Sequence, residues 1–149
     1  RPISSVIPGV VFSQADLMQA PELVREEHEG YCDSVSCLHT IEHFGLGRYG
    51  DPIDILGYEK GITNLASLTK PGGTLYLSTP IGIERVEFNA NRVFNPHTII
   101  DVAELNALKL ESLVVISDGS VQDIDVNEGS LRKLSEEIYS LGIFTFKKA

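Results

Sequence analysis

The feature that most restricts the fold of this chain is the alternation of strand-like and helix-like segments along its sequence. Short apolar or β-branched runs, typical of buried strands, lie at 10–16, 31–40, 74–79, 108–117 and 143–148. Segments with helix-forming composition or a helix-starting Asn-Pro pair lie between them, at 21–29, 58–69, from 95 onward and at 128–141. Strands that alternate with helices predict a mostly parallel sheet covered on both faces. Because no repeat or linker interrupts the sequence, we expect residues 1–149 to form a single domain.

The composition restricts the function of such a domain. Of the 149 residues, 42% are hydrophobic and 22% are charged, which is typical of a soluble globular domain. Acidic residues outnumber basic residues by 21 to 12, and the formal net charge of −9 argues against a broad nucleic-acid-binding surface. No apolar run approaches the roughly 20 residues that a membrane-spanning helix needs. We therefore expect neither a nucleic-acid partner nor a membrane partner.

The two cysteines indicate a cellular compartment. Cys32 and Cys37 lie in one predicted strand, and their odd spacing directs the side chains to opposite faces of it. They cannot bridge each other, and the sequence shows no charged-then-apolar signal segment. Both observations favour a reducing, cytoplasmic location.

Two short motifs begin at the end of the 31–40 segment and just after it. His39, Glu42 and His43 spell H-x-x-E-H, the inverted zinc-peptidase signature, which requires both histidines on one face of a helix. Glycines follow directly and disfavour a long helix, so zinc hydrolysis is a remote alternative. Residues 45–50 spell G-x-G-x-x-G, but a dinucleotide fingerprint must follow a strand directly and open a helix. Here the loop continues to Asp54 and opens no helix. The alternative to a dinucleotide-binding site is a flexible loop.

Polar side chains follow two of the predicted strands, where parallel sheets bind ligands. Asp16 ends the first strand and could accept a hydrogen bond from an exocyclic amine such as that of adenine, or cap a helix instead. A polar cluster follows the 74–79 strand and consists of Glu84, Arg85, Glu87, Asn89, Asn91 and Arg92. Its arginines suit a carboxylate or phosphate ligand, although a solvated loop would have the same composition.

Several of these segments resemble known motifs. Residues 31–43 (YCDSVSCLHTIEH) resemble the fourth strand of class I S-adenosylmethionine (SAM) methyltransferases, where the pattern is roughly F/Y-D-x-V followed by L-E-H. Residues 68–75 (LTKPGGTL) are similar to the L-x-P-G-G turn before their fifth strand, and residues 13–16 (SQAD) to the end of their third strand. Glu42–Asp54 and Pro80–Phe94 resemble more closely a methyltransferase-like family of unknown function. The likeness runs from about residue 1 to about residue 120.

The resemblance implies an α/β, Rossmann-like three-layer sandwich that transfers a methyl group from SAM to a small polar acceptor such as a sugar. By resemblance, Asp16 and Leu17 would contact adenine, and Cys37 and Leu38 would line the methionine side together with His39. The candidate bases are His39, Glu42 and His43. The candidate acceptor-binding residues are Arg48, Tyr49, Asp51, Arg85, Asn89 and Arg92. Each has an alternative: the histidines could cap a strand or bond within the loop, and Tyr49 could pack that loop.

One departure from the resemblance restricts what this chain does alone. Class I methyltransferases begin with a strand and a glycine-rich loop that cradles the methionine part of SAM, then a strand whose final acid binds ribose. Here the sequence opens with Arg1, its only methionine is Met18, and the only glycine among the first 29 residues is Gly9. We therefore expect an N-terminally truncated, partial domain that binds SAM only when an upstream segment or a partner completes the site.

The expected partners are a small-molecule substrate and a second copy of the chain, a homo-oligomer that would cover the incomplete sheet. An alternative from another class is a non-catalytic binding or assembly module with a methyltransferase-like fold, because a fold alone does not establish an activity.

Overall fold

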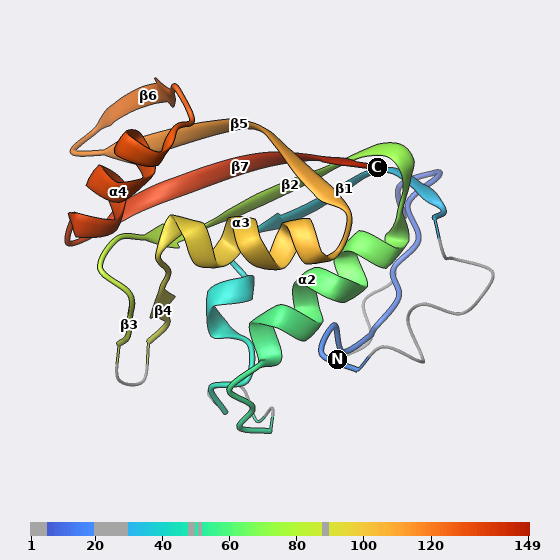
Figure 1. The fold of residues 1–149 in the computed structure, drawn as a ribbon. Coiled ribbons are helices and arrows are strands. Elements are labelled where there is room, and N and C mark those ends of the chain that lie inside the picture. The colour runs from blue at the N-terminus through green and yellow to red at the C-terminus, as the bar shows by residue number, and fades with distance from the viewer. Residues whose placement is uncertain (1–5, 20–29, 48–49, 51, 88–89) are drawn as a thin grey trace.

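The computed structural model describes residues 6–19, 30–47, 50, 52–87 and 90–149. They form a mixed α/β arrangement with a five-stranded sheet and a small two-stranded ribbon (Figure 1). The strands are β1 (Cys32–Leu38), β2 (Thr69–Ile81), β3 (Arg85–Val86), β4 (Arg92–Val93), β5 (Leu108–Ser117), β6 (Ser120–Ile124) and β7 (Ser140–Lys148). The helices are the short 3₁₀ helix η1 (Ile41–His43) and the α-helices α2 (Gly57–Leu68), α3 (Pro96–Leu105) and α4 (Glu128–Glu136).

The strand order in the sheet is β1-β2-β7-β5-β6. β1 and β2 are parallel, whereas the β2–β7, β7–β5 and β5–β6 pairs are antiparallel. The sheet is therefore mixed rather than mostly parallel in the described part of the chain. One cause is β7, which returns antiparallel between β2 and β5. The other is a tight hairpin between β5 and β6, where Asp118 and Gly119 both have positive φ angles, of 48° and 75°.

Most predicted elements are confirmed, with shifted bounds. The helix expected over 58–69 is α2, and the helix expected from residue 95 is α3, whose N-cap Asn95 side chain accepts a hydrogen bond from the backbone N–H of His97 (3.0 Å). The turn expected at 70–73 is instead an irregularity within the β1–β2 pairing, where Cys32 pairs with Thr69 but Ser34 pairs with Thr74. The helix expected to reach residue 141 ends at Glu136, because β7 begins at Ser140.

The N-terminal segment differs most from its prediction. The strand expected over 10–16 does not form, and Val10, Val11 and Phe12 are exposed. A strand needs a hydrogen-bonding neighbour, and none of the described strands pairs with this segment. Its far end lies against α2 instead, where the side-chain amide of Asn64 donates to the backbone carbonyl of Leu17 (2.6 Å). The helix expected over 21–29 lies outside the described residues.

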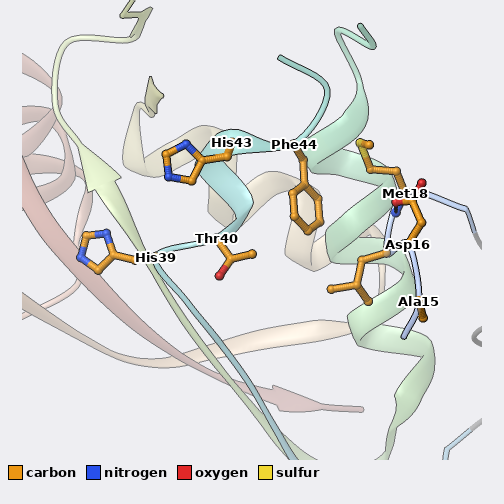
Figure 2. A pocket seen from close by; sticks show the side chains of 8 residues that line it. Ala15, Asp16, Met18, His39, Thr40, His43 and Phe44 are labelled. Carbon is orange, nitrogen blue, oxygen red and sulfur yellow. Dashed lines mark hydrogen bonds between the residues drawn. The ribbon is translucent and has the colours of Figure 1, made fainter. Parts of the chain in front are cut away.

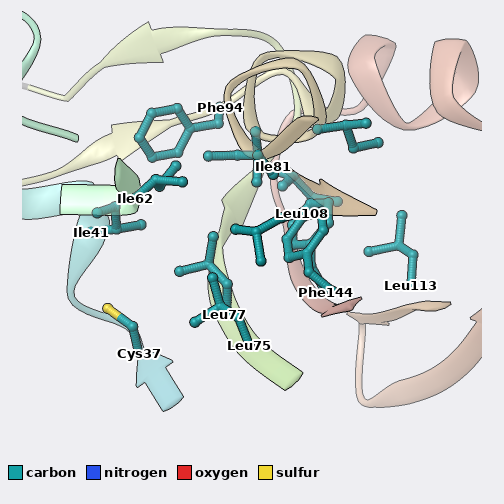
Figure 3. Close-up of a cluster of buried hydrophobic side chains, with 14 of the residues drawn as sticks. Cys37, Ile41, Ile62, Leu75, Leu77, Ile81, Phe94, Leu108, Leu113 and Phe144 are labelled. Atoms are coloured by element: carbon teal, nitrogen blue, oxygen red, sulfur yellow. The ribbon is translucent and has the colours of Figure 1, made fainter. Parts of the chain in front are cut away.

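The hydrophobic core lies between the sheet and the helices α2 and α3, which run along one of its faces (Figures 1 and 3). Alternate residues of two neighbouring strands point into it: Leu75 pairs with Phe146, and Leu77 pairs with Phe144. All four side chains are fully buried, as the period of two in a half-covered strand requires. The rings of Phe144 and Phe146 stack with centroids 5.8 Å apart.

Cys32 and Cys37 are both free thiols in β1, as their spacing predicts. No helix in the described part of the chain is long and apolar enough to cross a membrane. Because β1 and β2 are parallel, both end at the same edge of the sheet. η1 follows β1 at that edge, and the β3–β4 ribbon follows β2. The fold therefore brings the two predicted polar loops to one edge.

Candidate functional site

The candidate site begins where β1 ends. His39 has a φ angle of 51°, a left-handed backbone conformation that is uncommon outside glycine. Its backbone N–H donates to the carbonyl oxygen of Ser78 on β2 (3.0 Å), which fixes this turn to the end of the neighbouring strand. The chain therefore leaves the sheet sharply and starts η1 two residues later.

A glycine on α2 lets η1 pack closely against that helix. A Cβ atom added at Gly61 would lie 2.6 Å from Cδ1 of Ile41 and 2.7 Å from the ring of Phe44. Both distances are shorter than side chains tolerate, so only glycine allows this approach. Ile41 is fully buried there, and this contact sets the position of the residues on either side of it.

A pocket of about 490 Å³ opens beside η1, within the usual size range for small-molecule sites of roughly 300–1,000 Å³ (Figure 2). Its lining residues are Ala15, Asp16, Leu17, Met18, His39, Thr40, His43 and Phe44. In Figure 2 the two histidines lie on one side of η1 and Ala15, Asp16 and Met18 on the other, with both imidazole rings directed away from that segment. The fold thus brings two candidate bases and two candidate adenine contacts to one pocket.

A buried carboxylate links the two histidines. Glu42 is only 2% exposed, and its Oε1 lies 3.0 Å from Nδ1 of His39 and 3.9 Å from Nε2 of His43. The other ring nitrogen of His43, Nδ1, lies 2.9 Å from the carbonyl oxygen of Ala90. Oε2 of Glu42 is buried, and none of the described residues gives it a hydrogen bond. A buried carboxylate is costly without hydrogen-bond partners, and here the imidazole of His39 supplies one to Oε1.

Cys37 and Leu38 come directly before this cluster, but neither is among the residues that line the pocket. Cys37 is 5% exposed and faces the core. Burial, together with the negative charge of Glu42, raises the pKa of its thiol to about 11, so the thiol stays protonated and unreactive at neutral pH. Leu38 points to the opposite face of β1 and is 57% exposed.

The two described arginines of the predicted acceptor site both bind backbone carbonyls. Arg92 donates to the carbonyls of Phe44, Asp54 (3.5 Å) and Ile55 (3.4 Å), and its guanidinium lies 5.4 Å from the ring centroid of Tyr58. Burial lowers the pKa of Arg92, but not enough to remove its charge at physiological pH. The guanidinium therefore fixes the loop between η1 and α2.

Arg85 is held in a similar way on the β3–β4 ribbon. It donates to the carbonyls of Ile83 (2.9 Å) and Ile138 (2.8 Å) and pairs with the carboxylate of Glu87 (2.6 Å). Arg85 and Arg92 line a separate pocket of about 210 Å³. The other predicted acceptor-binding residues, Arg48, Tyr49, Asp51 and Asn89, lie outside the described residues.

Sequence reasoning missed some residues that shape the pocket. Met18 and Phe44 supply much of its apolar wall, and Asn64 holds the 15–18 segment against α2 through Leu17. Asn64 is 3% exposed on the buried face of a helix, and that polar residue at an apolar position is the signal that could have identified it. Met18 and Phe44 carry no such signal, because the fold alone brings them together.

Neither short motif adopts the context that its chemistry needs. Of the H-x-x-E-H residues, only Glu42 and His43 lie on a helical turn, the three-residue η1, and His39 precedes it. The described residues contain no group of three or more His, Cys, Asp or Glu side chains arranged to hold a metal ion. The glycine loop closes on itself: the Asp54 N–H donates to the Gly45 carbonyl (2.9 Å), and a Cβ at Gly45 would lie 2.0 Å from the Asp54 oxygen. It does not open a helix directly after a strand.

The fold is that of class I SAM-dependent methyltransferases, as comparison with solved structures shows. A proposed methyltransferase from Bacillus halodurans C-125 is similar with a TM-score of 0.61 at 13% identity, over 93% of this chain and 78% of that one. A SAM-dependent methyltransferase from Thermotoga maritima is similar with a TM-score of 0.57 at 14% identity, over 95% of this chain and 65% of that one. The [4+2]-cyclase SpnF is similar with a TM-score of 0.59 at 10% identity, over 92% of this chain and 55% of that one.

The chain itself belongs to the family described as Caenorhabditis protein of unknown function, DUF268, whose sequence profile matches residues 14–148. This confirms the predicted resemblance to a methyltransferase-like family of unknown function. No curated protein is significantly similar to the chain in sequence. The chain spans 55% of SpnF and 65% of the Thermotoga protein, less than two thirds of either.

Proposed function

We propose that this chain is part of a SAM-dependent methyltransferase that acts on a small polar acceptor such as a sugar. The observation that carries the proposal is the pocket beside η1 at the carboxyl end of β1, which Asp16 lines on one side and His39 and His43 line on the other. In open α/β sheets this edge is where ligands bind. The proposal also follows from the fold, which this chain shares with a SAM-dependent methyltransferase.

The pocket suits the nucleoside part of SAM. Leu17, Met18 and Phe44 offer apolar surface to a flat aromatic base, and a volume of about 490 Å³ is in the range for a ligand of that size. One carboxylate oxygen of Asp16 accepts the backbone N–H of Met18 (2.9 Å), which holds the side chain at the pocket. Its other oxygen is a suitable acceptor for the amino group of adenine.

The two sides of the pocket would bind different molecules, SAM on one side and the methyl acceptor on the other. When bound, SAM would supply an electrophilic methyl group on a sulfonium. The 15–18 segment would hold its adenine, while His39 and His43 lie on the other side of η1, where an acceptor would approach. Methyl transfer depends mainly on the alignment of the two reactants, so a rigid turn at His39 is a useful site for an acceptor-binding side chain.

The proposal includes two conditions on the whole protein. The ribose and methionine parts of SAM would be held by a further segment or by a partner chain, and a homo-oligomer that covers the free edge of β1 is the partner that we propose. A reducing, cytoplasmic location is consistent with the free thiols of Cys32 and Cys37.

Calorimetric titration with S-adenosylhomocysteine tests the proposal. We expect binding by the chain, and we expect Asp16→Asn to weaken it roughly 10- to 150-fold, since loss of a charged hydrogen-bond acceptor costs about 1.5–3 kcal/mol. Asp118→Asn, in the distant β5–β6 turn, is the matched control and should leave binding unchanged. If the chain does not bind the ligand, even as part of its full-length protein, the non-catalytic binding module becomes the better description.

A further inference from the structure

The cluster of His39, Glu42 and His43 contains three groups that could accept a proton, and its geometry separates their roles. Glu42 is almost fully buried at 2% exposure, so its carboxylate cannot reach an acceptor directly. The side chain of His43 is 23% exposed, and both of its ring nitrogens face groups of the protein, Ala90 and Glu42. The side chain of His39 is 50% exposed and uses only Nδ1 in a hydrogen bond to the described residues.

The hydrogen-bond partner of each imidazole ring determines which ring nitrogen carries the proton. A carbonyl oxygen only accepts hydrogen bonds, so Nδ1 of His43 carries a proton toward Ala90. An ionised carboxylate also only accepts, so Nδ1 of His39 carries a proton toward Oε1 of Glu42 (3.0 Å). A neutral His39 ring then has its lone pair on Nε2, because the hydrogen bond at one nitrogen sets the state of the other.

We propose that Glu42 is a positioning residue that holds His39 with Nε2 free to accept a proton, and that the acceptor of this site is therefore a hydroxyl compound. This inference rests on the proposed function. An alcohol must lose a proton as it is methylated, whereas a neutral amine can be methylated first and lose its proton afterwards. A positioned base is therefore most useful for a hydroxyl group.

In the transfer step, the hydroxyl oxygen of the acceptor is the nucleophile and His39 is the base. The acceptor oxygen forms a bond to the methyl carbon as the bond from that carbon to the sulfonium sulfur breaks, and the electron pair of the broken bond goes to sulfur. The hydroxyl proton goes to Nε2 of His39, giving an imidazolium whose charge the buried carboxylate of Glu42 stabilises. Nε2 of His43 lies 3.9 Å from the same oxygen, which is beyond hydrogen-bond distance.

Imidazole ¹⁵N NMR of the ligand-free chain tests the positioning role, at a pH well above the ordinary histidine range. We expect His39 to carry its proton on Nδ1 in the wild-type chain, and Glu42→Met, which removes the acceptor at similar side-chain length, to shift the population toward the Nε2-protonated form. His97, on α3 and 3.8 Å from Glu128, is the internal control and should not change. If the wild-type ring is protonated on Nε2, or if Glu42→Met leaves the tautomer as it was, the inference is wrong. Should Glu42→Met fail to fold, the wild-type spectrum decides.

Kinetics and binding separate this inference from the proposed function. With radiolabelled SAM and a panel of monosaccharides, we expect His39→Gln to lower kcat about 10²–10⁴-fold with KM for SAM nearly unchanged, and His97→Gln to have no effect. A wild-type chain that transfers methyl groups while His39→Gln keeps full kcat would overturn the role of His39 as base. Failure of S-adenosylhomocysteine to bind would overturn the proposed function instead, whatever the tautomer of His39.

Discussion

At the scale of single residues, a buried arginine illustrates how the loop beside the site is held. Arg92 is 8% exposed, and its guanidinium bonds to carbonyls of both Phe44, just after η1, and Ile55, just before α2. The several N–H groups of one guanidinium can donate to more than one carbonyl at once. A single side chain therefore connects the residue that follows η1 to a residue close before α2.

We predict that Arg92→Lys destabilises the chain by about 1.5–3 kcal/mol, because an ammonium cannot reach all of these carbonyls and hydrogen bonds to a charged group are lost. Urea unfolding monitored by circular dichroism measures the effect. Arg132→Lys is the matched control: Arg132 is exposed on α4 and its side chain pairs with Glu136 among the described residues, so the change should be under about 0.5 kcal/mol. Equal effects of the two substitutions would contradict the role given to Arg92.

The thiol of Cys37 predicts how stability depends on alkaline pH. Its pKa is raised from 9.0 to about 11 in the folded chain, so the folded state binds the thiol proton more tightly than the unfolded state does. Stability from this group is therefore complete below pH 9 and is lost as the pH rises toward 11, by roughly 2–3 kcal/mol. Urea unfolding between pH 8 and pH 11 should show this loss, and Cys37→Ala should flatten it. Cys32→Ala, in the same strand, should keep the wild-type slope.

At the scale of elements, the contact between η1 and α2 depends on the absence of a side chain at Gly61. Alanine is a better helix former by about 1 kcal/mol, but its Cβ would press on Ile41 and the Phe44 ring. We predict that Gly61→Ala is destabilising overall, since overpacking of a core costs about 1–3 kcal/mol. It should also weaken binding of S-adenosylhomocysteine, because Phe44 lines the pocket.

Gly129→Ala is the control for this prediction. Gly129 lies in the first turn of α4, where an added Cβ meets only the Asn127 side chain, at 3.3 Å. Helix propensity should then decide the result, so thermal unfolding should show no loss of stability. If Gly61→Ala proves as stable as Gly129→Ala, the two elements are not packed as closely as described.

The elements that the sequence predicts correctly are those with local signals. α3 carries an Asn-Pro start, and α2 has apolar residues at helical spacing. β6 was missed although Asp118-Gly119 is a strong hairpin signal, whereas the position of β7 between β2 and β5 has no local signal at all. The same distinction between local signals and tertiary contacts applies to the residues of the candidate site. The sequence motifs predicted Asp16 and His39 as site residues, and both line the pocket beside η1, but the binding of Arg92 to carbonyls of a distant loop depends on tertiary structure.

At the scale of the whole molecule, the sheet has a protected centre and an open edge. β2 and β7 each have neighbours on both sides, whereas β1 pairs only with β2 in the described part of the chain. Unpaired strand edges attract other strands, and Cys32–Leu38 offers such an edge. The homo-oligomer proposed above would bind at this edge.

Native-state hydrogen exchange should reflect this arrangement. We expect amides of β2 and β7 to exchange slowest and near the global rate of unfolding, and about half of the amides of β1, those directed away from β2, to exchange much faster. Mass spectrometry with peptide-level resolution measures the difference. Uniform protection of β1 that disappears on dilution would instead show that a second copy covers the edge.

The position of β7 also has a consequence for how the chain folds. β2 and β5 precede β7 in the sequence, but they are not neighbours in the sheet. β7 lies between them, so each lacks one neighbour until β7 has paired. The pairing of Thr74 with Lys147 must close a long loop, and such non-local contacts form slowly. Until then, two apolar strands expose their backbone edges to other chains. A newly made chain is therefore most prone to aggregate during this interval, and chaperone binding would protect it most then.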